Sequence, residues 1–182
     1  MTGSNPYAGK RMNISSQVIS ARADDQGRAS ARDAVEAIQP GLVAGSRVLT
    51  ADGACPVELL GPGDRIITRN AGIARLIDLR FWQYRGDFLQ IAAGALGSAR
   101  PETDTILATD QTVLLRGDKA MALTGQNAAL IRVADLPPLQ DCAFLQGIEM
   151  TVVQLIFDKP QLVYADGLET LCTPARRSSI AA

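Results

Sequence analysis

Short apolar segments alternate with turn residues through the middle of the chain, from Gly41 to about Pro174. Gly, Asp, Asn and Pro separate the segments, and these residues favour tight turns. The segments follow one another too closely for helical crossovers, so a parallel α/β sheet is disfavoured. The pattern therefore predicts an all-β domain over residues 41–174, built mostly from antiparallel strands.

Two hairpins are predicted at the start of this domain. Arg47–Thr50 and Pro56–Glu58 flank Ala51–Ala54, where the Asp-Gly pair favours a tight hairpin turn. Asp64–Thr68 and Ile73–Ile77 flank a second turn that contains Asn and Gly. We therefore expect two consecutive strand pairs here.

Further strands are predicted in the rest of the domain. Val152–Phe157 and Gln161–Tyr164 are expected to form a long hairpin, with Pro160 in the turn, where its missing N–H costs nothing. The other predicted strands are Arg80–Tyr84, Phe88–Ala92, Thr105–Leu107, Thr112–Leu115, Ala129–Val133, Cys142–Gln146 and Leu168–Leu171.

The two ends of the chain differ from the middle. Residues 1–40 are rich in Ser, Ala, Arg, Asp and Gly and poor in aromatic residues, so they predict a flexible leader. Within the leader, Ser30–Ile38 has the spacing of a short helix. Residues 175–182 are predicted to be a C-terminal tail. Met1–Ser16 lacks the apolar run of a signal peptide, so we expect a cytoplasmic protein without a membrane span, with leaderless export as the alternative.

The composition limits the chemistry and the partners. The chain has no histidine, which excludes histidine-dependent triads and zinc sites with histidine ligands. Its formal net charge is -1 and its basic residues are scattered, so nucleic acid is not an expected partner. Cys55, Cys142 and Cys172 are expected to be buried or free thiols, and one disulfide with a spare thiol is the alternative.

Several motifs together resemble the Hint family, which comprises the self-processing domains of Hedgehog proteins and inteins. Gly45–Gly53 contains Gly-Ser at the start of a strand followed by Asp-Gly, and Pro56–Ile66 contains Pro-Val-Glu, a leucine and Gly-Asp. Ile91–Gly97, Asp104–Leu115 and Tyr164–Glu169 add to the likeness, which is to a bacterial subgroup of the family. The resemblance implies a Hint-type disc with pseudo-two-fold symmetry, whose termini meet at the active site.

The resemblance also implies that the catalytic residues are missing. Active members use a cysteine, sometimes a serine, to attack the preceding carbonyl, and a histidine to protonate the departing amide nitrogen. Here Gly41 stands at the position of that cysteine and Gln111 at that of the histidine. Ala108 stands where Thr or Ser is expected, and Leu171–Thr173 lacks the His-Asn ending of inteins. We therefore expect a catalytically degenerate domain that has no catalytic residues and needs no cofactor.

Three functions remain open from the sequence. The leading hypothesis is a structural or protein-interaction module, whose partner and oligomeric state the sequence does not name. The alternative is slow self-processing through Cys55 or Ser46. The third is a carrier or oligomerisation domain of a secreted repeat protein, the context in which bacterial Hint domains often occur.

The acidic residues Glu102, Asp104 and Asp110 could be suspected as a carboxylate pair or a metal site. A site for a hard metal ion needs several converging oxygen atoms, which this spacing does not provide by itself. We therefore expect separately solvated strand ends and no metal.

Overall fold

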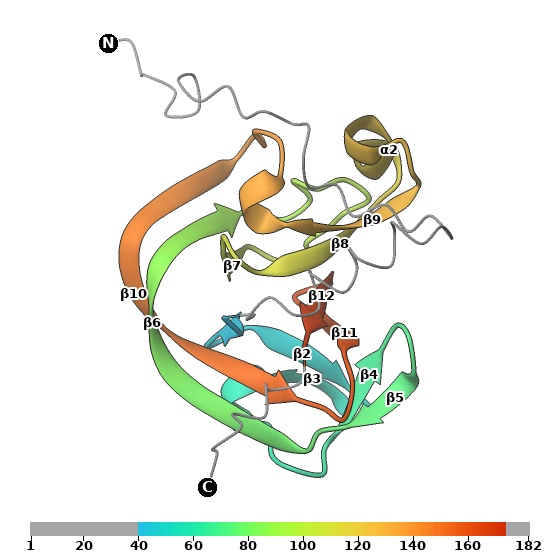
Figure 1. Ribbon diagram of the computed structural model, residues 1–182, viewed down its shortest axis with the longest axis vertical. Helices are drawn as coiled ribbons and strands as arrows, with labels where there is room; N and C mark the ends of the chain where they lie inside the picture. Colours follow the sequence, from blue (N-terminus) through green and yellow to red (C-terminus); the bar gives the residue numbers. More distant parts are fainter. Residues whose placement is uncertain (1–39, 174–182) are drawn as a thin grey trace, which may run out of the picture.

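The computed structural model describes residues 40–173, and this part consists mainly of β-strands (Figure 1). The prediction of an all-β domain is confirmed. The predicted leader, its helix at Ser30–Ile38 and the tail at 175–182 lie outside the described residues. The strands are β1 (Leu42–Val43), β2 (Arg47–Thr50), β3 (Gly53–Pro56), β4 (Arg65–Thr68), β5 (Gly72–Arg75), β6 (Asp78–Ile91), β7 (Thr105–Ala108), β8 (Thr112–Arg116), β9 (Ala128–Arg132), β10 (Cys142–Ile156), β11 (Gln161–Ala165) and β12 (Leu168–Cys172).

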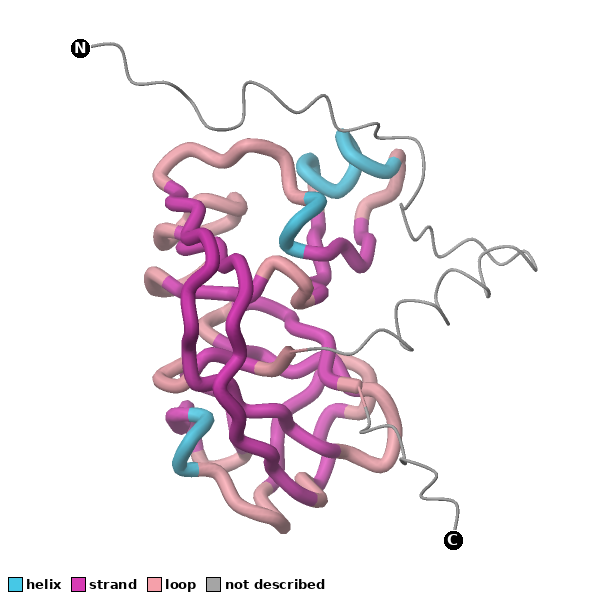
Figure 2. Tube along the Cα trace, turned by 60° about the vertical axis from the view of Figure 1, so that its left-hand side comes forward, coloured by secondary structure: helices cyan, strands magenta, loops and turns pink. Residues whose placement is uncertain are grey.

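The strands form two antiparallel sheets. The four-stranded sheet has the order β1-β10-β6-β7, and the eight-stranded sheet has the order β3-β2-β4-β11-β12-β8-β9, with β5 paired to β4. β6 and β10 pair along almost their whole length and form a curved ribbon along one side of the molecule (Figures 1 and 2). In Figure 1, β2 to β5 lie toward one end of this ribbon, and α2 (Asp118–Thr124), β8 and β9 lie toward the other.

Two buried apolar clusters divide the domain into halves that share β6, β10 and β12. The first cluster includes Val48, Ile66 and Val163, and the second includes Ile91, Val113 and Ile131. A small third cluster of Phe88, Ala108 and Val152 lies on the shared strands β6, β7 and β10. Burial of apolar surface on both sides of the ribbon is the main stabilising contribution expected for such a fold.

Two ion pairs to one buried carboxylate, that of Glu169, also connect the halves. Glu169 in β12 is 3% exposed, and its Oε1 lies 3.3 Å from Nη1 of Arg69 and 3.6 Å from Nη1 of Arg116. Arg69 follows β4 in the first half, whereas Arg116 ends β8 in the second. The carboxylate therefore holds residues from both halves to the central strand.

The predicted hairpin of Val152–Phe157 with Gln161–Tyr164 is wrong. β10 pairs with β6 and β1, whereas β11 pairs with β12, β4 and β2, so the connecting segment crosses from one sheet to the other. The hairpin partner of β11 is β12, joined through Asp166 and Gly167, which have φ of 51° and 79°. Positive φ at both central residues is typical of a two-residue hairpin turn. An apolar strand pattern does not identify the strand's partner, and this prediction failed for that reason.

Several predicted boundaries are also wrong. The strands predicted at Arg80–Tyr84 and Phe88–Ala92 are parts of one strand, β6, which ends at Ile91, and those at Cys142–Gln146 and Val152–Phe157 are parts of one strand, β10, which ends at Ile156. Both strands carry exposed polar residues near the middle. In the sequence, these residues look like a loop between two separate strands. The segment predicted as a strand at Pro56–Glu58 ends β3 and enters the 3-10 helix η1 (Val57–Leu59).

Short elements were missed. β1 has two residues and α2 has seven, too few to give a clear periodic pattern. A second 3-10 helix, η2 (Val133–Asp135), follows β9. Among residues 40–173, no helix is long and apolar enough to span a membrane.

Candidate functional site

Gly41 lies at the entry to the domain, against the backbone of β10. The strand that follows it, β1, pairs Leu42 with Val153 and Val43 with Val152. Gly41 has φ of +105°, and a Cβ atom added to it would lie 2.7 Å from the carbonyl oxygen of Val153. L-residues rarely adopt this φ, and a contact this short requires the backbone to shift. The structure therefore leaves no room for a side chain where the resemblance places the nucleophile.

The carbonyl group before Gly41 is held by Trp82 of β6. The indole Nε1 of Trp82 donates a hydrogen bond of 2.7 Å to the carbonyl oxygen of Pro40. Trp82 is the only tryptophan in the chain, and its partner across the ribbon is Val152. In active Hint domains, as the resemblance describes them, the carbonyl at this position is the one that is attacked. Here it accepts a hydrogen bond from a side chain of the domain.

Tyr84 connects this junction to the turn between β7 and β8. Its ring centroid lies 6.3 Å from that of Trp82, and its hydroxyl donates a hydrogen bond of 3.0 Å to Oδ2 of Asp110. Burial and the bond to the Asp110 carboxylate raise the pKa of Tyr84 to about 12. A Cβ atom at Gly86 would lie 2.7 Å from the Tyr84 ring, so the glycine provides the space in which the ring lies.

Gln111 follows this turn and is almost fully buried, with 1% of its surface exposed. Its Nε2 donates a hydrogen bond of 2.8 Å to the carbonyl oxygen of Leu171 in β12, and its main-chain N–H donates to Ala108. Within the described part of the chain, Oε1 of Gln111 has no hydrogen-bond partner. Gln111 therefore stands where the resemblance expects a histidine, and its side-chain amide is hydrogen-bonded to the last strand, β12. An amide cannot carry a proton at neutral pH.

A series of neighbouring residues connects the start of the described chain to its last strand, β12. The series runs from Pro40 through Trp82 and Tyr84 to Asp110, and then through the adjacent Gln111 to Leu171. The sequence analysis located Gly41, Ala108 and Gln111 in this region but missed Trp82 and Tyr84. Their spacing of two along a strand, which places both side chains on one face, was a signal that could have found them.

Neither fallback nucleophile is hydrogen-bonded to the junction within residues 40–173. Ser46 is buried, and its backbone N–H and C=O are bonded to Val43 and Val57. Cys55 is in β3, in the other sheet from β1, and its thiol donates to the carbonyl oxygen of Pro56 at 3.5 Å. Pro40 is therefore linked to Gln111 through Trp82, Tyr84 and Asp110, whereas Cys55 makes no hydrogen bond to this series among residues 40–173.

Among residues 40–173, the three thiols are unpaired and the carboxylates of Asp104 and Asp110 make separate contacts. Cys55, Cys142 and Cys172 are free, and burial raises the pKa of Cys172 to about 12, so this thiol stays protonated at neutral pH. Asp104 accepts a hydrogen bond from the N–H of Ala93, separately from the Tyr84–Asp110 pair. Residues 40–173 contain no cluster of three or more side chains suited to hold a metal ion.

Two solved structures are similar to this chain. The solution structure of a bacterial intein-like domain from Clostridium thermocellum is 13% identical, covers 75% of this chain and 99% of its own, and superimposes with a TM-score of 0.50. The crystal structure of the TvoVMA intein is 12% identical, covers 71% of this chain and 96% of its own, and has a TM-score of 0.49. No curated protein matches the sequence.

The family model described as Hint domain matches residues 40–172. This match spans the whole of β1 to β12, including Gly41, Ala108 and Gln111. The chain therefore belongs to the Hint domain family.

Proposed function

We propose that this protein is a Hint domain that has lost self-cleavage and serves as a structural or protein-interaction module. The observation that carries the proposal is the backbone at Gly41. A cysteine there would need an unfavourable positive φ and would place its Cβ atom 2.7 Å from the carbonyl oxygen of Val153. The proposed loss of the nucleophile therefore goes together with a backbone at Gly41 that has no room for the side chain of a nucleophile.

The second missing function is proton transfer. Departure of an amide nitrogen requires its protonation, and a positioned general acid is typically worth about 10²- to 10⁴-fold in rate. Gln111 cannot supply that proton, and its Nε2 is already bonded to Leu171. With neither nucleophile nor acid, the hydrogen bond from Trp82 to Pro40 has a structural role: it holds the segment before Gly41 to the ribbon.

The ribbon offers surface for a partner. Phe81 and Trp82 in β6 are 55% and 42% exposed, and Phe144 in β10 is 38% exposed. Large aromatic side chains are enriched at the centres of protein interfaces, where their burial contributes strongly to binding. This exposure supports the interaction role more than a purely structural one.

The test is intact-mass spectrometry of the chain carrying tags at both ends, incubated with and without dithiothreitol or hydroxylamine. We expect an unchanged mass. A fragment that begins at Gly41 would overturn the proposal. A fragment that disappears in Cys55→Ala or Ser46→Ala would instead establish the alternative, slow self-processing through that residue.

A double variant, Gly41→Cys with Gln111→His, makes the test sharper because it restores both residue types at once. We expect this variant to remain uncleaved, since the backbone at residue 41 does not accommodate the new side chain. Cleavage of the double variant would show that side-chain identity alone silenced the site, and the argument from backbone geometry would be wrong.

A further inference from the structure

Two arginine side chains share one oxygen atom of Glu169. Nη1 of Arg69 lies 3.3 Å from Oε1 of Glu169, and Nη1 of Arg116 lies 3.6 Å from the same atom. The two guanidinium groups are therefore neighbours, although Arg69 follows β4 and Arg116 ends β8. Each of the other ion pairs within residues 40–173 joins one arginine to one carboxylate. One positive charge is therefore left over at Glu169.

The outward N–H groups of both arginines are available to a ligand. A guanidinium group carries five N–H donors, and its contact with Glu169 uses only one of its nitrogen atoms. The side chains of Arg69 and Arg116 are 36% and 45% exposed, whereas that of Glu169 is 3% exposed. Among residues 40–173, no second carboxylate lies within ion-pair distance of either arginine. The buried carboxylate thus holds two cations in place and neutralises only one of them.

The arginine pair lies on the face of the eight-stranded sheet that points away from the two cores. Tyr164 is the direct partner of Glu169 in β11, and the register of β12 on β8 places Leu114 opposite Glu169 on the other side. Residues directly opposite each other in a sheet project to the same face. Tyr164 and Leu114 are half-buried, whereas Val163 and Val113, which precede them, are packed in the cores. An aromatic ring and an aliphatic side chain therefore flank Glu169 on this face.

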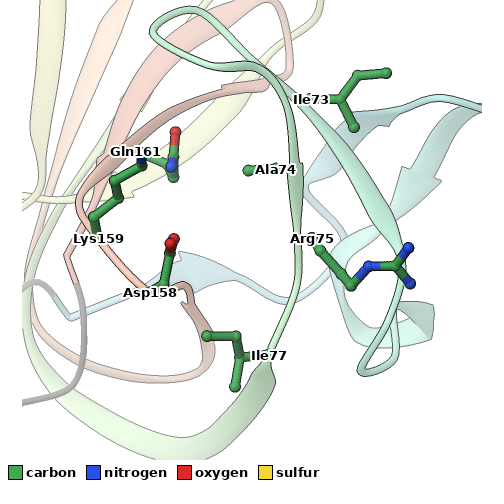
Figure 3. A pocket seen from close by; sticks show the side chains of 7 residues that line it. All are labelled: Ile73, Ala74, Arg75, Ile77, Asp158, Lys159 and Gln161. Atoms are coloured by element: carbon green, nitrogen blue, oxygen red, sulfur yellow. The ribbon is translucent and has the colours of Figure 1, made fainter.

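The cavity beside β5 does not combine these features (Figure 3). It has a volume of about 370 Å³ and is lined by both Asp158 and Lys159, so a carboxylate and an ammonium group are present together. Arg75 points away from it, and Nη1 of Arg75 donates a hydrogen bond to the carbonyl oxygen of Gly63. The cavity therefore offers an anion no pair of fixed cations, and its residues provide a reference region for the titration below.

From these features we infer that the arginine pair binds a carboxylate ligand with an apolar body. A carboxylate has two oxygen atoms in one plane, which match the paired N–H groups of a guanidinium group. Its single negative charge equals the positive charge left over at Glu169. The apolar body packs on Tyr164 and Leu114. The inference goes beyond the function proposed above and does not rest on the loss of self-cleavage, because the site shares no residue with the Gly41 junction.

The test is a titration of the isotope-labelled full chain with sodium benzoate, followed by the chemical shifts of the main-chain amides and of the arginine Nε–Hε groups. Benzamide has the same shape without the charge and is the matched control ligand. Ionic strength is kept constant with sodium chloride, because salt screens exposed charges.

We expect saturable shifts at Arg69, Arg116, Leu114 and Tyr164 with benzoate, and none there with benzamide. Residues 73–77 and 158–161, at the cavity beside β5, should not respond to either compound. The dissociation constant for benzoate should be on the order of 10 mM, because the site is open to water.

Single-arginine variants measure the contribution of each cation. Arg69→Gln and Arg116→Gln should each weaken binding about two- to fivefold, as expected for one partly exposed charge pair. Each variant leaves one arginine paired with Glu169, so the buried carboxylate keeps a partner and both variants are expected to fold. Arg132→Gln is the matched control, because Arg132 is 43% exposed and is neutralised by Asp135. It should leave binding unchanged.

Three results would overturn the inference: no saturable shifts at Arg69 and Arg116, equal binding of benzamide, or equal weakening by Arg132→Gln and Arg116→Gln. The second would mean that only apolar contact is involved, and the third that benzoate responds to positive charge in general. If one of the two arginine variants does not fold, the other decides. The mass assay for self-cleavage is unaffected by any of these outcomes, so the inference and the proposed function can fail separately.

Discussion

At the Gly41 junction the main chain leaves no room for a side chain, whereas at Gln111 a side chain is present, buried and hydrogen-bonded. The resemblance expects a catalytic residue at each position, and the two positions are occupied in physically different ways. The first is closed by the pairing of β1 with β10, and the second by the choice of one side chain. A single substitution can change the second position without moving a strand, but not the first.

The largest expected effect is from Gly41→Ala, with Gly45→Ala as the matched control. Both glycines have positive φ, +105° and +97°, but a Cβ atom at Gly45 would meet nothing within 4 Å. We expect Gly45→Ala to lower the free energy of unfolding by about 1 to 2 kcal/mol, the cost of the backbone conformation. Gly41→Ala should lower it by about 2 to 4 kcal/mol, because overpacking against Val153 adds to that cost. Urea denaturation measures both, and equal losses would contradict the steric argument.

Gln111→Leu tests the second position, where a buried side chain is hydrogen-bonded to β12. The variant keeps the buried volume but removes the donor to Leu171, so the carbonyl loses its side-chain partner. We expect a loss of about 1 to 2 kcal/mol in the free energy of unfolding, measured by the same denaturation. A loss as large as that for Gly41→Ala would mean that the two positions do not differ in how they are closed.

Trp82→Phe tests the connection between the two regions. It removes the indole N–H that holds the Pro40 carbonyl, while keeping an aromatic ring beside Tyr84. We expect a loss of about 1 kcal/mol in the free energy of unfolding, measured by circular dichroism because the only tryptophan is removed. A stability unchanged from the wild type would show that water replaces the indole without cost.

The smallest expected effect is a change in the alkaline pH dependence on Tyr84→Phe. In the folded protein the pKa of Tyr84 is raised from 10.0 to about 12, so the folded state retains a proton that the unfolded state releases. The contribution of protonated Tyr84 to the free energy of unfolding is therefore fully present below about pH 10 and is lost as the pH rises toward 12. Denaturation at several pH values should show a shallower loss of stability for the variant than for the wild type. Parallel curves would rule out this contribution from Tyr84.

The sequence analysis succeeded where structure is local. The turns at residues 51–52 and 69–71 connect the strand pairs β2–β3 and β4–β5 near the predicted places, because hairpin register depends on residues close in sequence. It failed at β10, whose partners β6 and β1 lie far away in sequence, and it paired β11 with the preceding strand, whereas β11 forms its hairpin with the following strand, β12.

In the candidate site, too, the sequence indicated the local features and not the long-range contacts. Alignment of motifs located Gly41 and Gln111, but the contact of Gly41 with Val153 depends on the register of β1 on β10. The bond from Trp82 to Pro40 joins residues 42 positions apart, so no local pattern reveals it.

The shared ribbon has a consequence for how the domain melts. Val152 and Val153 are consecutive in β10, yet Val153 belongs to the first cluster and Val152 to the small third one. β6 likewise supplies Leu79 to the first cluster and Ile91 to the second. One half cannot lose its packing without pulling apart strands on which the other half depends. We therefore expect the two cores to be cooperatively coupled and to unfold together on heating, even though no single core spans the described domain.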